Sequence, residues 1–108
     1  YAAVRGAVTY YSIADPERNA ALAKWLTDAV SECMHTINRG IKTRTYPDHP
    51  ELDYYGVLRH SVAYGCPCAM LIEHGFHTNP EDSAFLQDSE CLKKLAHAEA
   101  EVIDDFFR

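Results

Sequence analysis

The segment MLIEHGFHTNPED, residues 70–82, contains the residue best suited to chemistry. Three apolar residues lead directly into Glu73, Gly75 follows, and Asn79-Pro80 has the form of a helix start. An unpaired carboxylate at the end of a buried strand is costly, and no lysine or arginine adjoins this one in the sequence. Its position leaves two interpretations open. Glu73 acts as a proton carrier in a cleft, or it caps a helix or pairs with a distant arginine.

The strand that would present Glu73 is expected in a parallel sheet. Ala69–Glu73 is apolar at both alternating sets of positions, which is typical of a parallel strand covered by helices on both faces. In open α/β sheets, sites form beyond the carboxyl ends of such strands. Glu73 would then lie at that end of the most buried strand, where a carboxylate can exchange protons with a bound molecule.

Histidines and cysteines are weaker candidates for metal or redox chemistry. His74 and His77 are three residues apart and His60 lies upstream, but a zinc site needs three converging ligands. Strand alternation also turns His74 away from the acid, so we expect surface or rim histidines. One residue separates Cys66 from Cys68, whereas zinc ribbons and thioredoxin-like sites use two. Free thiols are therefore expected, with a small metal or redox protein as a minor alternative.

Two tyrosine pairs and one arginine have alternative interpretations. Tyr10-Tyr11 and Tyr54-Tyr55 could line a glycan groove because aromatic rings stack on sugars, although burial of one member of each pair is the simpler interpretation. Arg39 could reach a peptide carboxylate or compensate a helix dipole.

Composition and charge exclude several classes of protein. The chain has 108 residues, 47% of them hydrophobic, which predicts one packed domain. A net charge of -6 with scattered Lys and Arg argues against a nucleic-acid surface. The longest apolar run, Cys68–Ile72, is far too short to cross a bilayer, and no signal peptide is visible. We expect neither nucleic acid nor a membrane as a partner.

Strand and helix patterns alternate along the chain. Ala7–Tyr11 is rich in β-branched and aromatic residues, as strands are. Asp15-Pro16 begins a helix with apolar positions three and four apart. Trp25 lies among them and is expected in the core. This helix should end near Asn38-Arg39-Gly40, where the glycine suits a left-handed C-terminal position.

The rest of the chain continues this alternation. Ile41–Tyr46 predicts an extended segment, Tyr54–Arg59 a short strand and Ser61–Tyr64 a helical turn. Helices are expected after Asn79 and from Ser89 onward. The fold class is therefore α/β, a layered and mostly parallel sheet flanked by helices.

Four segments together resemble a known family. PCAMLIEHGFHTNPEDSAFL, residues 67–86, resembles the C-terminal signature of the zinc-dependent N-acetylmuramoyl-L-alanine amidases, the Amidase_3 family. GAVTYYS, NRGIK and YGVLRHS resemble three earlier segments of that family in the same order. The resemblance extends over nearly the whole chain.

This resemblance implies a reaction. It gives Glu73 the place of the family's catalytic glutamate. The family hydrolyses the amide between N-acetylmuramic acid and the L-alanine of the stem peptide, beside a zinc-bound water. The glutamate accepts the water's proton and returns it to the departing amine. Peptidoglycan is the implied partner. The implied setting is extracellular or in the cell wall for an autolysin, or the host wall for a phage-encoded endolysin.

The family's zinc ligands have no counterpart among these residues. They are two histidines and a glutamate in the N-terminal half, whereas this chain begins at Tyr1, after the last of them. We therefore expect residues 1–108 to form the C-terminal portion of a single amidase catalytic domain, without its N-terminal strands. The open sheet edge could pair with a second copy. The alternative function is a non-catalytic cell-wall-binding or interaction module derived from an amidase domain.

Overall fold

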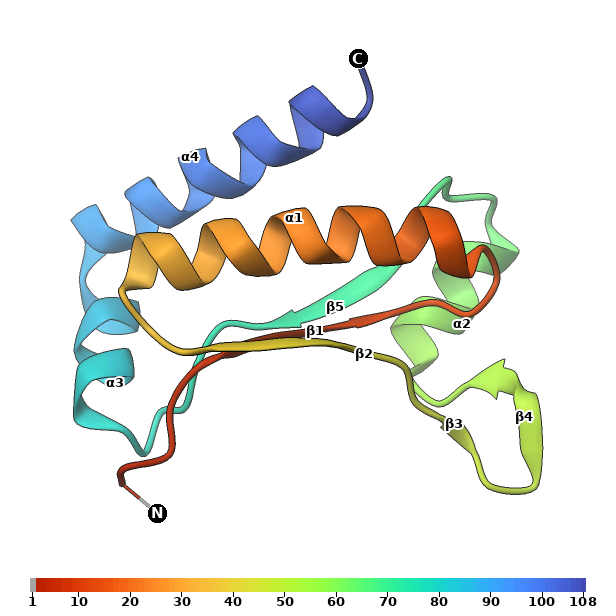
Figure 1. Ribbon diagram of the computed structural model, residues 1–108, viewed down its shortest axis with the longest axis horizontal. Coiled ribbons are helices and arrows are strands. Elements are labelled where there is room, and N and C mark those ends of the chain that lie inside the picture. Colours follow the sequence, from red (N-terminus) through yellow and green to blue (C-terminus); the bar gives the residue numbers. More distant parts are fainter. Residues whose placement is uncertain (1) are drawn as a thin grey trace.

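A three-stranded sheet lies beneath two long helices in the computed structural model, which describes residues 2–108 (Figure 1). The strands are β1 (Ala7–Tyr11), β2 (Asn38–Lys42), β3 (Thr45–Tyr46), β4 (His49–Asp53) and β5 (Met70–Glu73). The helices are α1 (Pro16–Met34), α2 (Gly56–Ala63), α3 (Pro80–Gln87) and α4 (Ser89–Phe106). The central sheet has the order β2-β1-β5, and β3 and β4 form a separate hairpin. These layers confirm the predicted α/β class.

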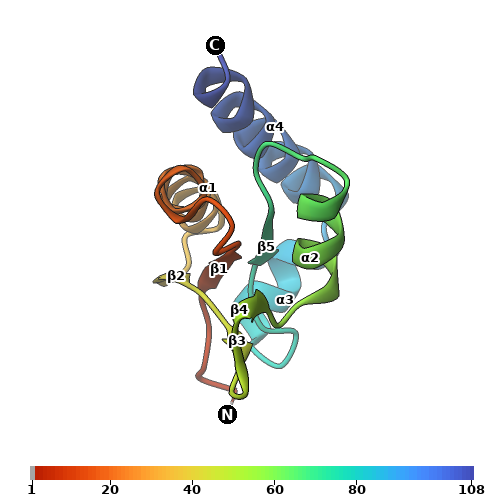
Figure 2. The same cartoon turned by 90° about the vertical axis from the view of Figure 1, so that its right-hand side faces the viewer.

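The direction of β5 differs from the prediction. β1 and β2 are parallel, but β5 runs antiparallel to β1, so that Glu73 lies opposite Val8 and Met70 opposite Tyr11. The sheet is therefore mixed, and β5 is only half-buried. Its residues are apolar at successive positions because helices cover the strand on two sides, and this pattern does not indicate the direction of the strand. α1 packs on one side and α2 on the other (Figure 2).

Helix α1 begins as predicted and ends early. Asp15 accepts a hydrogen bond from the Arg18 N–H at 3.3 Å, and Pro16 is the first helical residue. The helix ends at Met34 because His35 takes the left-handed conformation, with φ of 51°. The predicted end at Asn38-Arg39-Gly40 is wrong, since these residues belong to β2 and lengthen the expected strand.

Trp25 lies outside the core, contrary to the prediction. The core cluster consists of Ala7, Val30, Met34 and Leu95, contributed by β1, α1 and α4. The side chain of Trp25 is 48% exposed. Its ring packs edge-to-face on Phe106, the last residue of α4, at a centroid distance of 5.4 Å.

A helix replaces the short strand predicted at Tyr54–Arg59. Tyr55 precedes the first turn of α2, which extends through part of the predicted helical turn at Ser61–Tyr64. The aromatic and β-branched residues here favour a strand locally, but burial of Leu58 against the sheet outweighs that preference. Only tertiary packing determines this element.

The last two helices agree with the predictions. The Asn79 side chain accepts hydrogen bonds from the Glu81 and Asp82 N–H groups at 3.1 and 3.0 Å, as a cap of α3 should. α4 buries Leu95. Among residues 2–108, no helix combines the length and the apolar character that crossing a membrane requires.

Both outer strands of the described sheet, β2 and β5, have a free edge. Such edges present unpaired backbone groups that can template pairing with another chain. Self-association through one of them stays a prediction.

Asn19 links α1 to the segment that enters β5. Its side chain is buried, accepts the Ala69 N–H at 2.8 Å and donates to the Asp15 carbonyl at 3.0 Å. We expect Asn19→Ala to lower the free energy of unfolding by about 1–3 kcal/mol, because a buried N–H loses its acceptor. Urea denaturation measures the change.

The matched control is Glu32→Ala, at an exposed position of the same helix, which should shift the free energy of unfolding by less than about 0.5 kcal/mol. Equal midpoints for the two variants would show that the Asn19 link contributes nothing.

Candidate active site

Glu73 is the last residue of β5, and its side chain is exposed. The antiparallel register places it on the same face of the sheet as Val8, Tyr10 and Leu71. That face points away from α1, because Thr9 on the other face lies 2.6 Å from Thr27 of α1. Glu73 forms no ion pair with any residue from 2 to 108. The carboxylate is therefore accessible, which disfavours the interpretation as an ion-pair partner or helix cap.

Tyr10 is the nearest polar neighbour of Glu73 that the register provides. Burial raises the pKa of the Tyr10 hydroxyl, and the neighbouring Tyr55 and Glu73 raise it further. The rings of Tyr10 and Tyr55 meet at 5.1 Å. A tyrosine hydroxyl is protonated at neutral pH, and the raised pKa favours that form further, so Tyr10 can donate a hydrogen bond beside the carboxylate.

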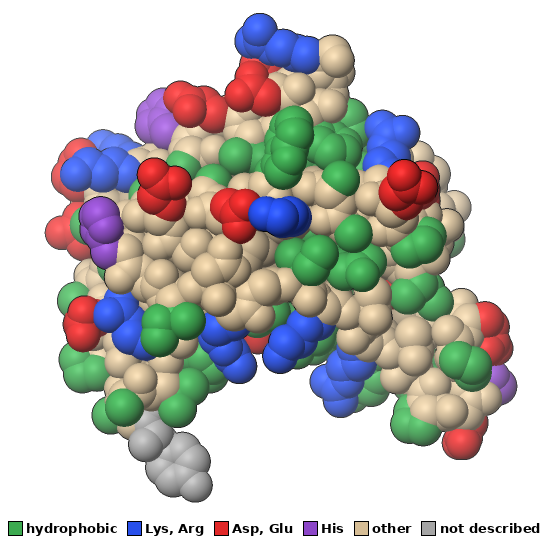
Figure 3. Space-filling model, in the orientation of Figure 1, with side chains coloured by type: hydrophobic (Ala, Val, Ile, Leu, Met, Phe, Trp, Pro, Cys, Tyr) green, Lys and Arg blue, Asp and Glu red, His purple; other side chains and the backbone are tan. Residues whose placement is uncertain are grey.

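An arginine and several aromatic rings continue this surface. The Arg44 guanidinium lies 3.7 Å from the centre of the Tyr54 ring and 5.8 Å from that of Tyr55. Tyr54 also contacts Tyr46 at 5.3 Å. Arg59 fixes the start of α2, donating to the Tyr54 carbonyl at 2.7 Å. Figure 3 shows the molecule hollowed below the sheet, beside the β3–β4 hairpin, with Lys and Arg side chains along the hollow.

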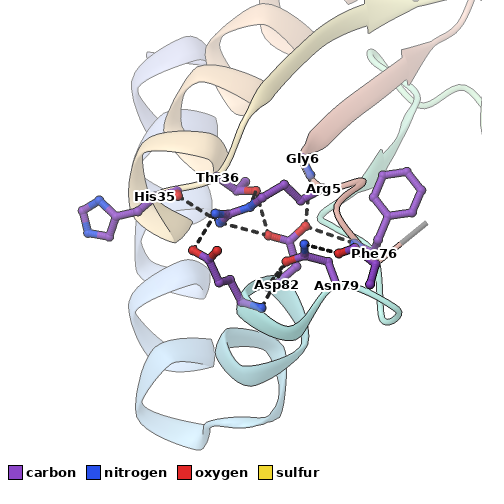
Figure 4. A network of polar contacts seen from close by, with 9 residues as sticks. Arg5, Gly6, His35, Thr36, Phe76, Asn79 and Asp82 are labelled. Carbon is purple, nitrogen blue, oxygen red and sulfur yellow. Dashed lines mark hydrogen bonds and ion pairs between the residues drawn. The ribbon is translucent and has the colours of Figure 1, made fainter.

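A buried carboxylate holds the loop that follows Glu73 (Figure 4). Asp82, whose side chain is fully buried, accepts hydrogen bonds from the Gly6 N–H at 3.0 Å, the Phe76 N–H at 3.2 Å and the Thr36 hydroxyl at 2.7 Å. Arg5 adds an ion pair at 3.3 Å. Asp82 thus ties the residues that precede β1 and β2, and the loop that follows β5, to the start of α3.

The ionisation of Asp82 and the size of Gly75 fit this network. Burial by itself raises the pKa of Asp82, but the hydrogen bonds from Thr36, Gly6 and Phe76, together with Arg5, lower it overall. A Cβ at Gly75 would meet the Asp82 carboxylate at 2.8 Å, so only glycine allows this approach.

The structure does not gather the histidines and cysteines into a metal site. His74 turns toward the helices and lies 3.1 Å from Glu99 of α4, while His60 and His77 are exposed. The cysteines at 33, 66, 68 and 91 are free. In the part of the chain that the structure describes, no three His, Cys, Asp or Glu side chains lie close enough to hold a metal ion.

Comparison with known proteins gives a family match and several similar structures. The model of the Amidase_3 family, described as N-acetylmuramoyl-L-alanine amidase, matches residues 1–105. No curated protein sequence matches. Cwp6 from Clostridium difficile has a TM-score of 0.82 and 28% identity, covering 99% of this chain and 16% of that protein.

Two further solved structures share the fold. The CwlD amidase from Clostridioides difficile, in complex with the GerS lipoprotein, has a TM-score of 0.75 and 24% identity, covering 99% of this chain. An N-acetylmuramoyl-L-alanine amidase from Clostridium difficile 630 has a TM-score of 0.73 and 22% identity, covering 95%. The chain spans 48% of each of these two structures.

Proposed function

Because the chain belongs to the N-acetylmuramoyl-L-alanine amidase family, we propose that the complete polypeptide hydrolyses the amide between N-acetylmuramic acid and L-alanine in peptidoglycan. Glu73 is the general acid/base. The observation that carries this role is its exposed carboxylate, which has no ion-pair partner among residues 2–108 and lies beside the protonated Tyr10.

The reaction requires two proton transfers at one carboxylate. Glu73 accepts a proton from the water that attacks the lactyl carbonyl carbon. The C–N bond then breaks, and Glu73 returns the proton to the departing nitrogen of L-alanine. The products are a muramic acid carboxylate and a stem peptide with a free amino group. Tyr10 can orient the water or the carbonyl oxygen through its hydroxyl.

The family resemblance implies a zinc ion, but the family's zinc ligands have no counterpart in this chain. Residues 2–108 do not by themselves fit a zinc site, since no three ligand side chains converge among them. We therefore propose that residues 1–108 are the C-terminal portion of a single catalytic domain and that the zinc ligands come from elsewhere in it. The chain's coverage of about half of two amidase structures supports this division.

The zinc content of histidine variants tests this division of labour. We expect His77→Ala and His74→Gln in the complete polypeptide to leave the zinc content at that of the parent protein, because neither side chain is a ligand. Atomic absorption after dialysis measures it. Loss of the ion in either variant would place a ligand within this segment.

The function itself is tested with purified peptidoglycan. We expect the complete polypeptide to release stem peptides that begin with a free L-alanine, identified by mass spectrometry. Its site of action is then the cell wall, reached from outside the cell or, for a phage-encoded enzyme, in the host. Retention on peptidoglycan without release would instead favour the non-catalytic binding module.

A further inference from the structure

Two cations beside the candidate site have no acidic partner among residues 2–108. Lys42 pairs with Tyr10 across the sheet and so shares the face of Glu73. Arg44 follows two residues later, beside the tyrosines of α2 and the hairpin. Neither forms an ion pair within residues 2–108. In a chain with a net charge of -6, two uncompensated cations on one face make a local positive patch.

Arg44 is held in position. Its carbonyl accepts the Tyr54 N–H at 2.8 Å, and its guanidinium carbon lies over the Tyr54 ring, 3.7 Å from the ring centre. Hydrogen bonding with Tyr55 raises the pKa of Arg44 further above its usual value. A guanidinium positioned in this way loses little conformational entropy when it binds an anion, and its planar donors match a carboxylate.

The spacing fits a short peptide bound with its scissile amide at Glu73. Glu73 of β5 lies opposite Val8 of β1, and Lys42 of β2 lies opposite Tyr10 of β1. The two residues are thus two strands apart and offset by two positions, about 12 Å between backbones. An extended peptide spans about 3.3–3.6 Å per residue, so Lys42 lies about three to four residues from the cleaved bond. Arg44 follows Lys42 by two residues, further along the same direction.

We propose that Lys42 and Arg44 form a recognition site for a free carboxylate of the stem peptide. This inference rests on the proposed function and adds its substrate class, acidic stem peptides in preference to amidated ones. Lys42 contributes a point charge and Arg44 paired donors, which an uncharged carboxamide cannot use equally. The site sets affinity and does not touch the reacting atoms.

Steady-state kinetics of the complete polypeptide test the site with two muropeptides, one with free stem carboxylates and one with these groups amidated. We expect Arg44→Gln to raise KM for the acidic substrate by about 10- to 100-fold and to leave kcat nearly unchanged. Lys42→Gln should raise it less, because its side chain is a flexible point charge. Neither variant should alter KM for the amidated substrate by more than about twofold.

Lys24→Gln, on the exposed side of α1, is the matched control and should leave both KM values unchanged. Arg44→Lys should restore part of the preference. An Arg44→Gln effect of equal size on both substrates, or no effect on either, would overturn the carboxylate site.

Binding measurements separate this inference from the proposed reaction. Fluorescence polarisation with labelled stem peptides, performed on the Glu73→Gln protein, reports affinity without turnover. Preference for the acidic peptide that Arg44→Gln removes would support the site even if the parent protein released no peptide, and the proposed hydrolysis alone would then be wrong. Hydrolysis without that preference would disprove the carboxylate site and leave the proposed reaction standing.

Discussion

Glu73→Gln in the complete polypeptide is expected to lower kcat for stem-peptide release by about 10²- to 10⁴-fold, with little change in KM. Glutamine keeps the size and hydrogen-bonding reach of the side chain but cannot accept the proton of the attacking water. Because Glu73 is exposed and has no ion-pair partner in residues 2–108, the fold should not change. Mass spectrometry of released peptides over time measures the rate.

The controls separate lost chemistry from lost structure. Glu101→Gln changes an exposed carboxylate on α4 and should retain full activity. Glu73→Asp keeps the carboxylate but shortens its reach, so we expect an intermediate rate. The zinc content and the melting temperature of Glu73→Gln should match those of the parent protein. Unchanged turnover would refute the acid/base role.

Elements with local signals could be predicted from the sequence. Asp15-Pro16 and Asn79-Pro80 start helices where predicted, because a capping side chain and a proline act on the backbone beside them. The strand Ala7–Tyr11 also agrees residue for residue. Such features depend on neighbours within a few positions.

Features that depend on distant residues were not predictable. The apolar run of β5 indicated a parallel strand, yet the same pattern arises wherever helices cover two sides, whichever way the strand runs. The helix at Gly56–Ala63 has strand-forming residues and becomes helical where it buries Leu58. Trp25 fits the apolar stripe of α1, yet its ring contacts Phe106 at the C-terminal end of α4 and stays half exposed.

The candidate site likewise contains one residue that a local sequence signal revealed and others that depend on distant contacts. Glu73 could be singled out by its place after an apolar run, and family resemblance supplied the role that we propose for it. Arg44 and Tyr10, which lie near it, precede it by 29 and 63 positions in the sequence. Asp82 contacts Gly6 over a separation of 76 residues. A glycine that precedes an acid by seven positions gave no usable signal of their approach.

Asp82→Ala is expected to give the largest loss of stability, about 3–5 kcal/mol in the free energy of unfolding. The change removes the acceptor for two backbone N–H groups and the Thr36 hydroxyl, and it leaves Arg5 without its buried partner. Urea denaturation followed by circular dichroism measures the loss. Asp82→Asn keeps the volume but places donors against donors, so it should also destabilise the fold.

Glu81→Gln is the matched control, since Glu81 pairs with the same Arg5 at 2.6 Å but is 74% exposed. An exposed pair contributes about 1 kcal/mol or less, so this variant should remain close to the parent protein. A loss for Asp82→Ala no greater than that for Glu81→Gln would contradict the network's structural role.

The pH dependence of stability provides a second test of Asp82. Its pKa is lowered in the folded protein, so the folded state binds this proton less readily than the unfolded chain does. The contribution is therefore fully present above the unfolded carboxyl value of about 4 and is lost as the pH falls through the lower folded value. Denaturation midpoints measured between neutral and strongly acidic pH should fall more steeply for the parent than for Asp82→Asn, which has no proton to bind at this position. Identical slopes would mean that Asp82 is not held ionised by Gly6, Thr36 and Phe76.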